Sequence, residues 1–268
     1  MTRVMTLGAL VGPVLFTMSW LVLGAVSPGY TMWDIVVPSY SPIAQPISGL
    51  GLGVTGPFMN AAFVASAALL FAGIVGIFRG IGQIGPRART ICIALLSLVP
   101  VGMAIDGIFT LESFFPHFLG YLVAIGSTVV SFLVVGSVLR GVPRWRWLGS
   151  GLRLGGGLTL VLLALAQLTF DPIAAGANVG IAGLTERLAV TEVLAWFVLM
   201  GSVALRTYSL ESRRGLLPRG MPALPVLPTL EAASRGARRD DLRAHRAPAR
   251  RVPVAHARRG RALPVLGR

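Results

Sequence analysis

Residues 57–79, PFMNAAFVASAALLFAGIVGIFR, hold no charged side chain before Arg79. A helix needs about 20 consecutive apolar residues to cross roughly 30 Å of hydrocarbon. Because backbone polar groups in lipid must be paired within the chain, such a run forms a helix. The alternation typical of a membrane β-barrel strand is absent. Five further segments share this character: about 5–26, 90–110, 117–139, 152–170 and 186–206. The sequence therefore predicts an all-α membrane protein, a six-transmembrane-helix bundle over residues 1–206.

Composition supports this fold class. Charged residues make up 13% of the 268, against roughly 25% in soluble domains, and the mean hydropathy is +0.75. These values argue against a soluble globular protein. The first apolar segment follows Arg3 and is longer than the apolar region of a typical signal peptide, so we expect a retained helix. The single cysteine, Cys92, cannot form an internal disulfide.

Arginine placement predicts the orientation in the cell membrane. Connections on the cytoplasmic side are enriched in basic residues. Arginines stand before the first segment, after the sixth, and in the connections between segments two and three and between four and five. The connections at about 27–56, 111–116 and 171–185 contain no arginine. We therefore expect a multi-pass protein with both termini in the cytoplasm.

Residues 207–268 differ in composition from the rest. They hold fourteen arginines and four acidic residues, are rich in alanine and proline, and have no aromatic residue after Tyr208. This composition predicts a disordered cytoplasmic tail. A polybasic segment beside a membrane attracts anionic lipids. We expect no nucleic-acid binding, because stacking aromatics are missing.

Polar residues gather at the outer ends of the predicted helices. Six of them form the candidate site, as ligand-binding or ion-pair groups: Asp106, Glu112, His117, Asp171, Glu186 and Arg187. Gln167 lies one turn deeper than Asp171 on the same face. Segments three and four are joined by a short turn, so Asp106 and His117 are expected to approach each other. Arg187 is expected to pair with Asp106 or Asp171, since the adjacent Glu186 points about 100° away around the helix.

These residues also carry a resemblance. The element ISGL, with Ser48 and Leu50, precedes the second segment, and GLTER, with Gly183, Glu186 and Arg187, opens the sixth. Together with Asp106 and His117, their order resembles a six-helix bacterial and archaeal membrane family, domain of unknown function 998. The resemblance covers about residues 1–206 and implies no activity. One departure is Gly49, where the family often has glutamate.

Three classes of function remain open. In the first, an outward-facing polar pocket binds or transports a small solute or a lipid head group. In the second, Asp106 and His117 are the catalytic pair of a lipid-directed hydrolase, with Ser48 as a nucleophile or with a metal held also by Asp171 or Glu186. In the third, the protein is a non-catalytic accessory or scaffold subunit, and its polar groups only pair helix ends. The membrane domain has one histidine, whereas zinc hydrolases usually use two or three. We therefore expect no metal and no cofactor, and we favour binding or transport over enzymatic activity.

Overall fold

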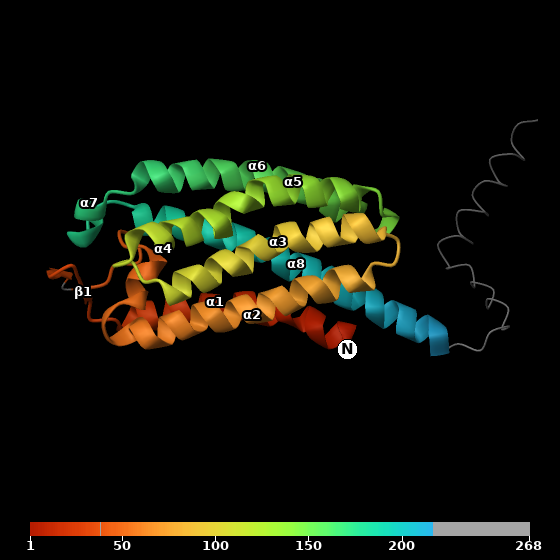
Figure 1. The fold of residues 1–268 in the computed structure, drawn as a ribbon, viewed down its shortest axis with the longest axis horizontal. Coiled ribbons are helices and arrows are strands. Elements are labelled where there is room, and N and C mark those ends of the chain that lie inside the picture. The colour runs from red at the N-terminus through yellow and green to blue at the C-terminus, as the bar shows by residue number, and fades with distance from the viewer. Residues whose placement is uncertain (38, 217–268) are drawn as a thin grey trace, which may run out of the picture. The chain divides into compact units, whose positions relative to one another are not determined.

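The computed structural model describes residues 1–37 and 39–216 and contains six helices long and apolar enough to cross a membrane (Figure 1). This confirms the predicted fold class. The fourth span is made of three consecutive pieces, α4, η3 and α5. The elements of the six spans are α1 (Thr2–Val26), α2 (Gly56–Gly80), α3 (Pro86–Ile108), α4 (Phe114–Tyr121), η3 (Leu122–Gly126), α5 (Ser127–Arg140), α6 (Arg146–Thr169) and α8 (Ala182–Leu216). Residues 217–268, most of the predicted basic tail, lie outside the described residues. Its first residues, up to Leu216, belong to α8.

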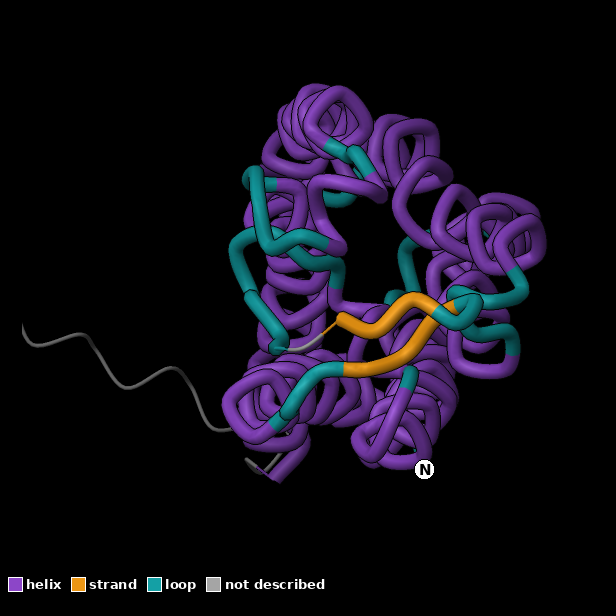
Figure 2. The backbone as a smooth tube through the Cα atoms, turned by 90° about the vertical axis from the view of Figure 1, so that its left-hand side faces the viewer, coloured by secondary structure: helices purple, strands orange, loops and turns teal. Residues whose placement is uncertain are grey.

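The spans form a closed ring. Each packs against the next along the chain: α1 on α2, α2 on α3, α3 on the fourth span, and α5 on α6. The last helix, α8, packs against both α6 and α1 and so closes the circle. Figure 2 looks along the helices. A closed ring of six helices leaves an interior that side chains of every span can reach.

Small residues allow neighbouring helices to approach closely. A Cβ placed on Gly73 of α2 would lie 2.7 Å from the Cα of Ala9 on α1. Gly102 of α3 lies similarly close to the backbone of Ala124 in η3. Van der Waals packing is a main source of helix association in lipid, and small residues make such packing possible.

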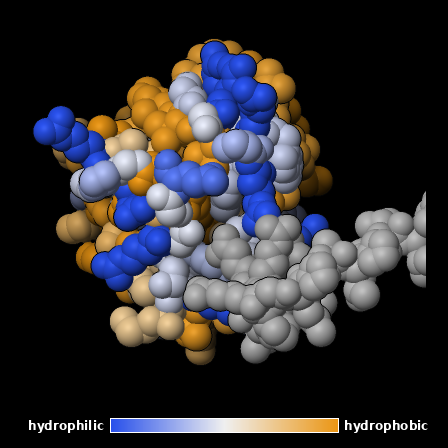
Figure 3. All heavy atoms as spheres, turned by 90° about the vertical axis from the view of Figure 1, so that its right-hand side faces the viewer, coloured by the Kyte–Doolittle hydropathy of each residue, from blue (hydrophilic) through white to orange (hydrophobic). Residues whose placement is uncertain are grey.

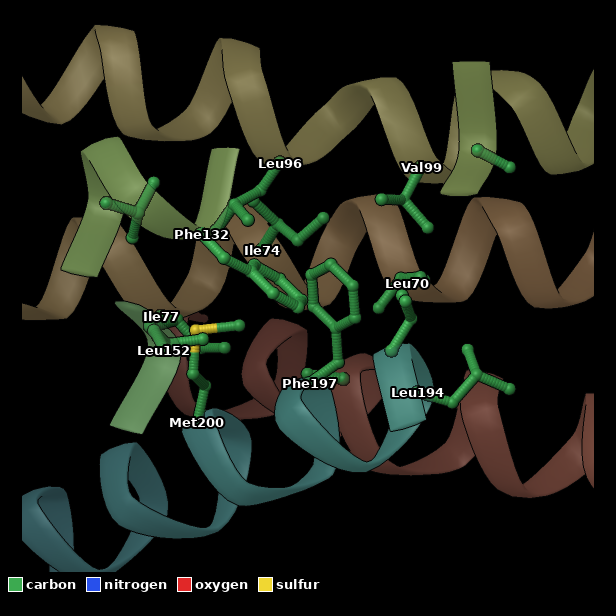
Figure 4. Close-up of a cluster of buried hydrophobic side chains, with 14 of the residues drawn as sticks. Leu70, Ile74, Ile77, Leu96, Val99, Phe132, Leu152, Leu194, Phe197 and Met200 are labelled. Carbon is green, nitrogen blue, oxygen red and sulfur yellow. The ribbon is translucent and has the colours of Figure 1, made fainter. Parts of the chain in front are cut away.

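Large apolar side chains fill the middle of the ring and cover its outside. In Figure 4 Phe132 of α5 and Phe197 of α8 lie together, with ring centroids 6.2 Å apart. Leu70 of α2 and Leu96 of α3 are fully buried in the same cluster. Other leucines, such as Leu168, face outward and are exposed. A soluble protein rarely exposes so much apolar surface, whereas lipid covers it.

One end of the ring, called here the hairpin end, carries short elements between the spans. The strands β1 (Tyr30–Met32) and β2 (Ile35–Val37) pair antiparallel, with Tyr30 opposite Val37. Both residues of the turn between them, Trp33 and Asp34, have positive φ, as a type I′ turn requires. The other short elements at this end are η1 (Ile47–Gly51), η2 (Gly53–Thr55) and α7 (Pro172–Gly176).

The opposite end, called the arginine end, carries the connections between α2 and α3 and between α5 and α6. The latter contains η4 (Pro143–Trp145). The start of α1 and the end of α8 lie at this end too (Figure 1). Figure 3 shows hydrophilic side chains gathered here. Exposed arginines at this end are Arg79, Arg87, Arg140, Arg144 and Arg146.

Candidate functional site

A cavity of about 310 Å³ opens inside the ring toward the hairpin end. Ligand pockets typically measure about 300–1,000 Å³. All six spans contribute to its wall, and so do residues 46–48 of the connection between α1 and α2, called here the first long loop (residues 27–55). The size and the shared wall make this cavity the candidate site.

The polar side chains of the cavity wall lie in the half nearer the hairpin end, together with aromatic ones, and the deeper half is apolar. Along α3 the lining residues are Asp106 nearest the hairpin end, then Met103, then Val99. On the antiparallel α8, Ala182 and Glu186 line the cavity near that end, and the apolar Val190, Val193 and Leu194 follow with depth. The polar lining side chains are Ser48, Asp106, His117, Tyr121, Gln167 and Glu186. The cavity is therefore amphipathic along the direction of the helices.

The structure brings Asp106 and His117 together, with 3.8 Å between Asp106 Oδ1 and His117 Nδ1. His117 Nδ1 lies closer, 2.7 Å, to the carbonyl oxygen of Phe109. A carbonyl only accepts hydrogen bonds, so Nδ1 carries the proton and donates it there. In the neutral ring Nε2 is then an acceptor. Asp106 Oδ1 is buried against Gly120 and accepts no hydrogen bond from the described residues.

Glu186 lines the cavity from the first turns of α8. One of its carboxylate oxygens, Oε2, accepts a hydrogen bond from the backbone N–H of Ile47 at 2.9 Å. Its other oxygen makes no hydrogen bond within residues 1–37 and 39–216. Glu186 therefore holds the first long loop against α8 and still offers a free acceptor to the cavity.

Arg187 points away from the cavity and into the first long loop. Its Nη1 donates to the carbonyl oxygens of Gln45 at 2.9 Å and of Gly183 at 2.8 Å. Its Nη2 donates to the hydroxyl of Tyr40, and its guanidinium lies 5.3 Å from the ring centroid of Trp20. Within the described residues no carboxylate lies within 4.0 Å of it. The predicted ion pair with Asp106 or Asp171 is therefore wrong, because carbonyls, a hydroxyl and aromatic rings surround this charge instead.

Tyr40 links Arg187 to the backbone of the first long loop. Burial raises the pKa of its hydroxyl, an effect that the neighbouring Arg187 opposes. The protonated hydroxyl donates to the carbonyl oxygen of Pro46 at 3.0 Å while it accepts from Arg187. Arg187 and Tyr40 together fix the loop segment that forms part of the cavity wall.

Besides Arg187, two further predicted site residues lie outside the cavity. Glu112 is exposed, and its backbone carbonyl accepts a hydrogen bond from Trp33 Nε1 at 3.2 Å. Asp171 is exposed and caps α7, since its Oδ1 accepts from the backbone N–H of Ile173 at 2.9 Å and of Ala174 at 3.1 Å. The cavity thus retains Asp106, His117 and Glu186 of the six predicted residues.

A family model described as "Protein of unknown function (DUF998)" matches residues 10–203. This chain belongs to that family. The match includes α2 to α7 and most of α1 and α8. No curated protein and no solved structure matches the chain.

In this DUF998 chain the two short elements that carried the resemblance contact each other, because the backbone N–H of Ile47 in ISGL donates to Glu186 Oε2 in GLTER at 2.9 Å. The residues just before ISGL add two bonds: Gly183 donates its N–H to the carbonyl oxygen of Ala44 at 3.3 Å, and Leu184 donates to that of Ile43 at 2.9 Å. Within ISGL, Ser48 lines the cavity, whereas Leu50 is fully buried in the core. The first long loop is thereby an ordered cap on α8.

The departure at Gly49 has a local structural reason. A Cβ on Gly49 would lie 3.0 Å from the hydroxyl of Tyr30 and equally close to its ring. In this DUF998 chain Tyr30 therefore fills the space into which a glutamate side chain at position 49 would project. A larger residue at 49 requires Tyr30 to move.

Several features of the site were not predicted. The segment η3 is a π-helix between α4 and α5, and Ala124 and Ile125 within it line the cavity. Such π-segments are frequent at functional sites, yet no proline or charge in LVAIG marks one. Tyr121, directly before it, lines the cavity with a buried hydroxyl that lies near Gln167. An aromatic residue in an apolar run is an ordinary core residue in sequence terms, so nothing distinguished it.

Beyond the Asp106–His117 pair, the described residues supply neither the serine contact nor the metal ligands that the hydrolase hypothesis names. No hydrogen bond joins Ser48 to His117 in the described residues, and His117 Nδ1 is directed to a backbone carbonyl. Across the described residues no group of three or more His, Cys, Asp or Glu side chains is placed to hold a metal ion.

Proposed function

We propose that this protein binds a single-chain amphiphile or lipid, with its head group among the polar residues near the hairpin end and its chain in the apolar depth. The observation that carries this proposal is the polar-to-apolar gradient of a cavity large enough for a small ligand. Val99, Ile125 and Leu194 line the apolar half of the cavity. A polar, water-soluble solute would make no favourable contacts with that half.

The rim of the cavity favours entry from the bilayer. Phe114, Phe118 and Phe170 all line the cavity and are also 52%, 36% and 40% exposed. Phe114 and Phe118 lie parallel on α4, with ring centroids 6.0 Å apart. Near this rim α4 packs against α3, while α6 packs against α5 and α8. An aromatic rim between helices that are not packed together offers a path for an acyl chain.

The proposal includes an orientation in the cell membrane. Arginines at the arginine end favour a cytoplasmic location for both termini, which places the cavity mouth on the outer side. On the cytoplasmic side, the arginine-rich tail would contact anionic lipids. The test is labelling of intact cells with a membrane-impermeant maleimide, because the native Cys92 is buried. Ser113→Cys at the hairpin end should label and Gln83→Cys at the arginine end should not. The reverse pattern would refute the orientation.

Binding itself is tested by thermal unfolding of the purified protein in nanodiscs, with alkyl amphiphiles of six to twelve carbons added. The wild type should be stabilised. Val190→Trp places a large ring in the cavity wall and should abolish stabilisation by the longest chains first. The matched control, Leu188→Trp, lies on the same helix, is 48% exposed and does not line the cavity. If no amphiphile stabilises the wild type, or both variants respond alike, the cavity is not the binding site.

A further inference from the structure

We propose that the head group bound in this cavity is a primary ammonium, held between the carboxylates of Asp106 and Glu186. This inference rests on the proposed function and specifies its ligand class. It starts from the hydrogen-bonding groups that the described residues leave unused.

Asp106 is the most telling of these groups. Its side chain is 7% exposed, yet neither carboxylate oxygen accepts a hydrogen bond from the described residues. Buried polar groups in proteins are almost always paired, and an unpaired buried carboxylate is costly. The residue lines the cavity, and because Oδ1 lies against Gly120, a ligand in the cavity is placed to donate to the other carboxylate oxygen, Oδ2.

Glu186 and His117 add acceptors to the same wall. Glu186 uses one oxygen for Ile47 and leaves the other free, and His117 directs its N–H to Phe109 and leaves Nε2 as an acceptor. A primary ammonium has three N–H donors and no acceptor. The three groups therefore match its donors in kind and in number.

The charges in the wall favour a cation. The lining residues include two carboxyl groups and no arginine, and the chain contains no lysine. Asp106 and Glu186 line the same cavity, so negative charges on both would repel each other. Arg187, the nearest cation along α8, is engaged by Tyr40, Gln45 and Gly183. A cationic ligand relieves this repulsion, and an anionic one increases it.

The experiment compares three probes with the same chain: dodecylammonium, dodecanol and dodecanoate. Each is titrated into the wild type in nanodiscs of zwitterionic lipid at pH 7, where an alkylamine is protonated. We expect dodecylammonium to bind at least about tenfold more tightly than dodecanol, equivalent to about 1.4 kcal/mol, and dodecanoate to bind most weakly. Asp106→Asn and Glu186→Gln should each remove most of this preference. The controls Asp171→Asn and Glu112→Gln make the same chemical changes at exposed residues outside the cavity and should retain it.

Each outcome has a distinct meaning. If dodecanol binds as tightly as dodecylammonium, the ammonium inference is wrong while the amphiphile site stands. If no probe binds, both fail. If sodium or calcium ions stabilise the protein and dodecylammonium does not, the carboxylates form an ion site and the inference is again overturned. The comparison of head groups uses the wild type alone, so a variant that fails to fold does not prevent the decision.

Discussion

Gly183, in the first turn of α8, is the position where the structure makes its most specific stability prediction. A Cβ there would lie 2.7 Å from the carbonyl carbon of Gln45 and 2.8 Å from Arg187 Nη1, and closer still to the Gln45 carbonyl oxygen. Real Cβ atoms do not approach backbone atoms this closely. Gly183→Ala therefore forces the first long loop away from α8.

The magnitude follows from three contributions. Overpacking of this kind costs about 1–3 kcal/mol. Movement of the loop also weakens the hydrogen bonds from Leu184 to Ile43 and from Arg187 to Gln45, each worth about 1 kcal/mol. Alanine in place of glycine in a helix returns about 0.5–1 kcal/mol. We expect a net destabilisation of about 1–4 kcal/mol.

The assay is thermal unfolding in detergent, with Gly157→Ala as the matched control. Gly157 lies within α6, and no heavy atom is within 4 Å of the Cβ position there. The same substitution should therefore keep or raise the midpoint at Gly157 and lower it at Gly183. If Gly183→Ala is as stable as the wild type, the loop is not docked on α8 as described and the account of the cavity wall fails with it.

Three further predictions concern other polar contacts. Arg187→Lys replaces a forked donor by a single ammonium and should destabilise the protein by about 1–3 kcal/mol, measured as a lower unfolding midpoint. An unchanged midpoint would contradict the role of Arg187 in holding the first long loop. Glu192 accepts hydrogen bonds from Thr159 Oγ1 at 2.8 Å and Trp196 Nε1 at 2.6 Å, so Glu192→Ala should cost about 1–2 kcal/mol, whereas Glu192→Gln, which keeps an acceptor, should cost less. Burial raises the pKa of Tyr30 to about 12, so the folded state holds this proton when the unfolded chain has lost it; stability should fall as pH rises between about 10 and 12, and Tyr30→Phe should flatten that fall.

The sequence predicted the spans well because lipid imposes a simple local rule. An apolar run of sufficient length must form a helix, whatever its neighbours. The same rule fails for finer detail. The π-segment η3 interrupts the fourth span without a break in apolar composition. Within this segment Ala124 packs closely against Gly102, a residue on a different span.

The candidate site was predicted in part. Asp106 and His117 meet because a short connection leaves their helices no other arrangement. Glu112 lies in that same connection and Asp171 in the longer one between α6 and α8, yet both are exposed and neither lines the cavity. Spacing along the chain places a residue at an end of the bundle and does not say which way it points.

Arg187 shows most clearly where sequence reasoning ends. An outer-end arginine near several acids suggested an ion pair, but Tyr40 and Gln45, more than 140 residues away in the sequence, supply its partners. Taken alone, the sequence determined six membrane-spanning helices and the end of the bundle at which the polar groups gather, because both follow from local composition. Only the tertiary structure decided that the helices close into a ring around an amphipathic cavity and which charges face it. That choice depends on long-range contacts between loop and helix, which no local pattern encodes.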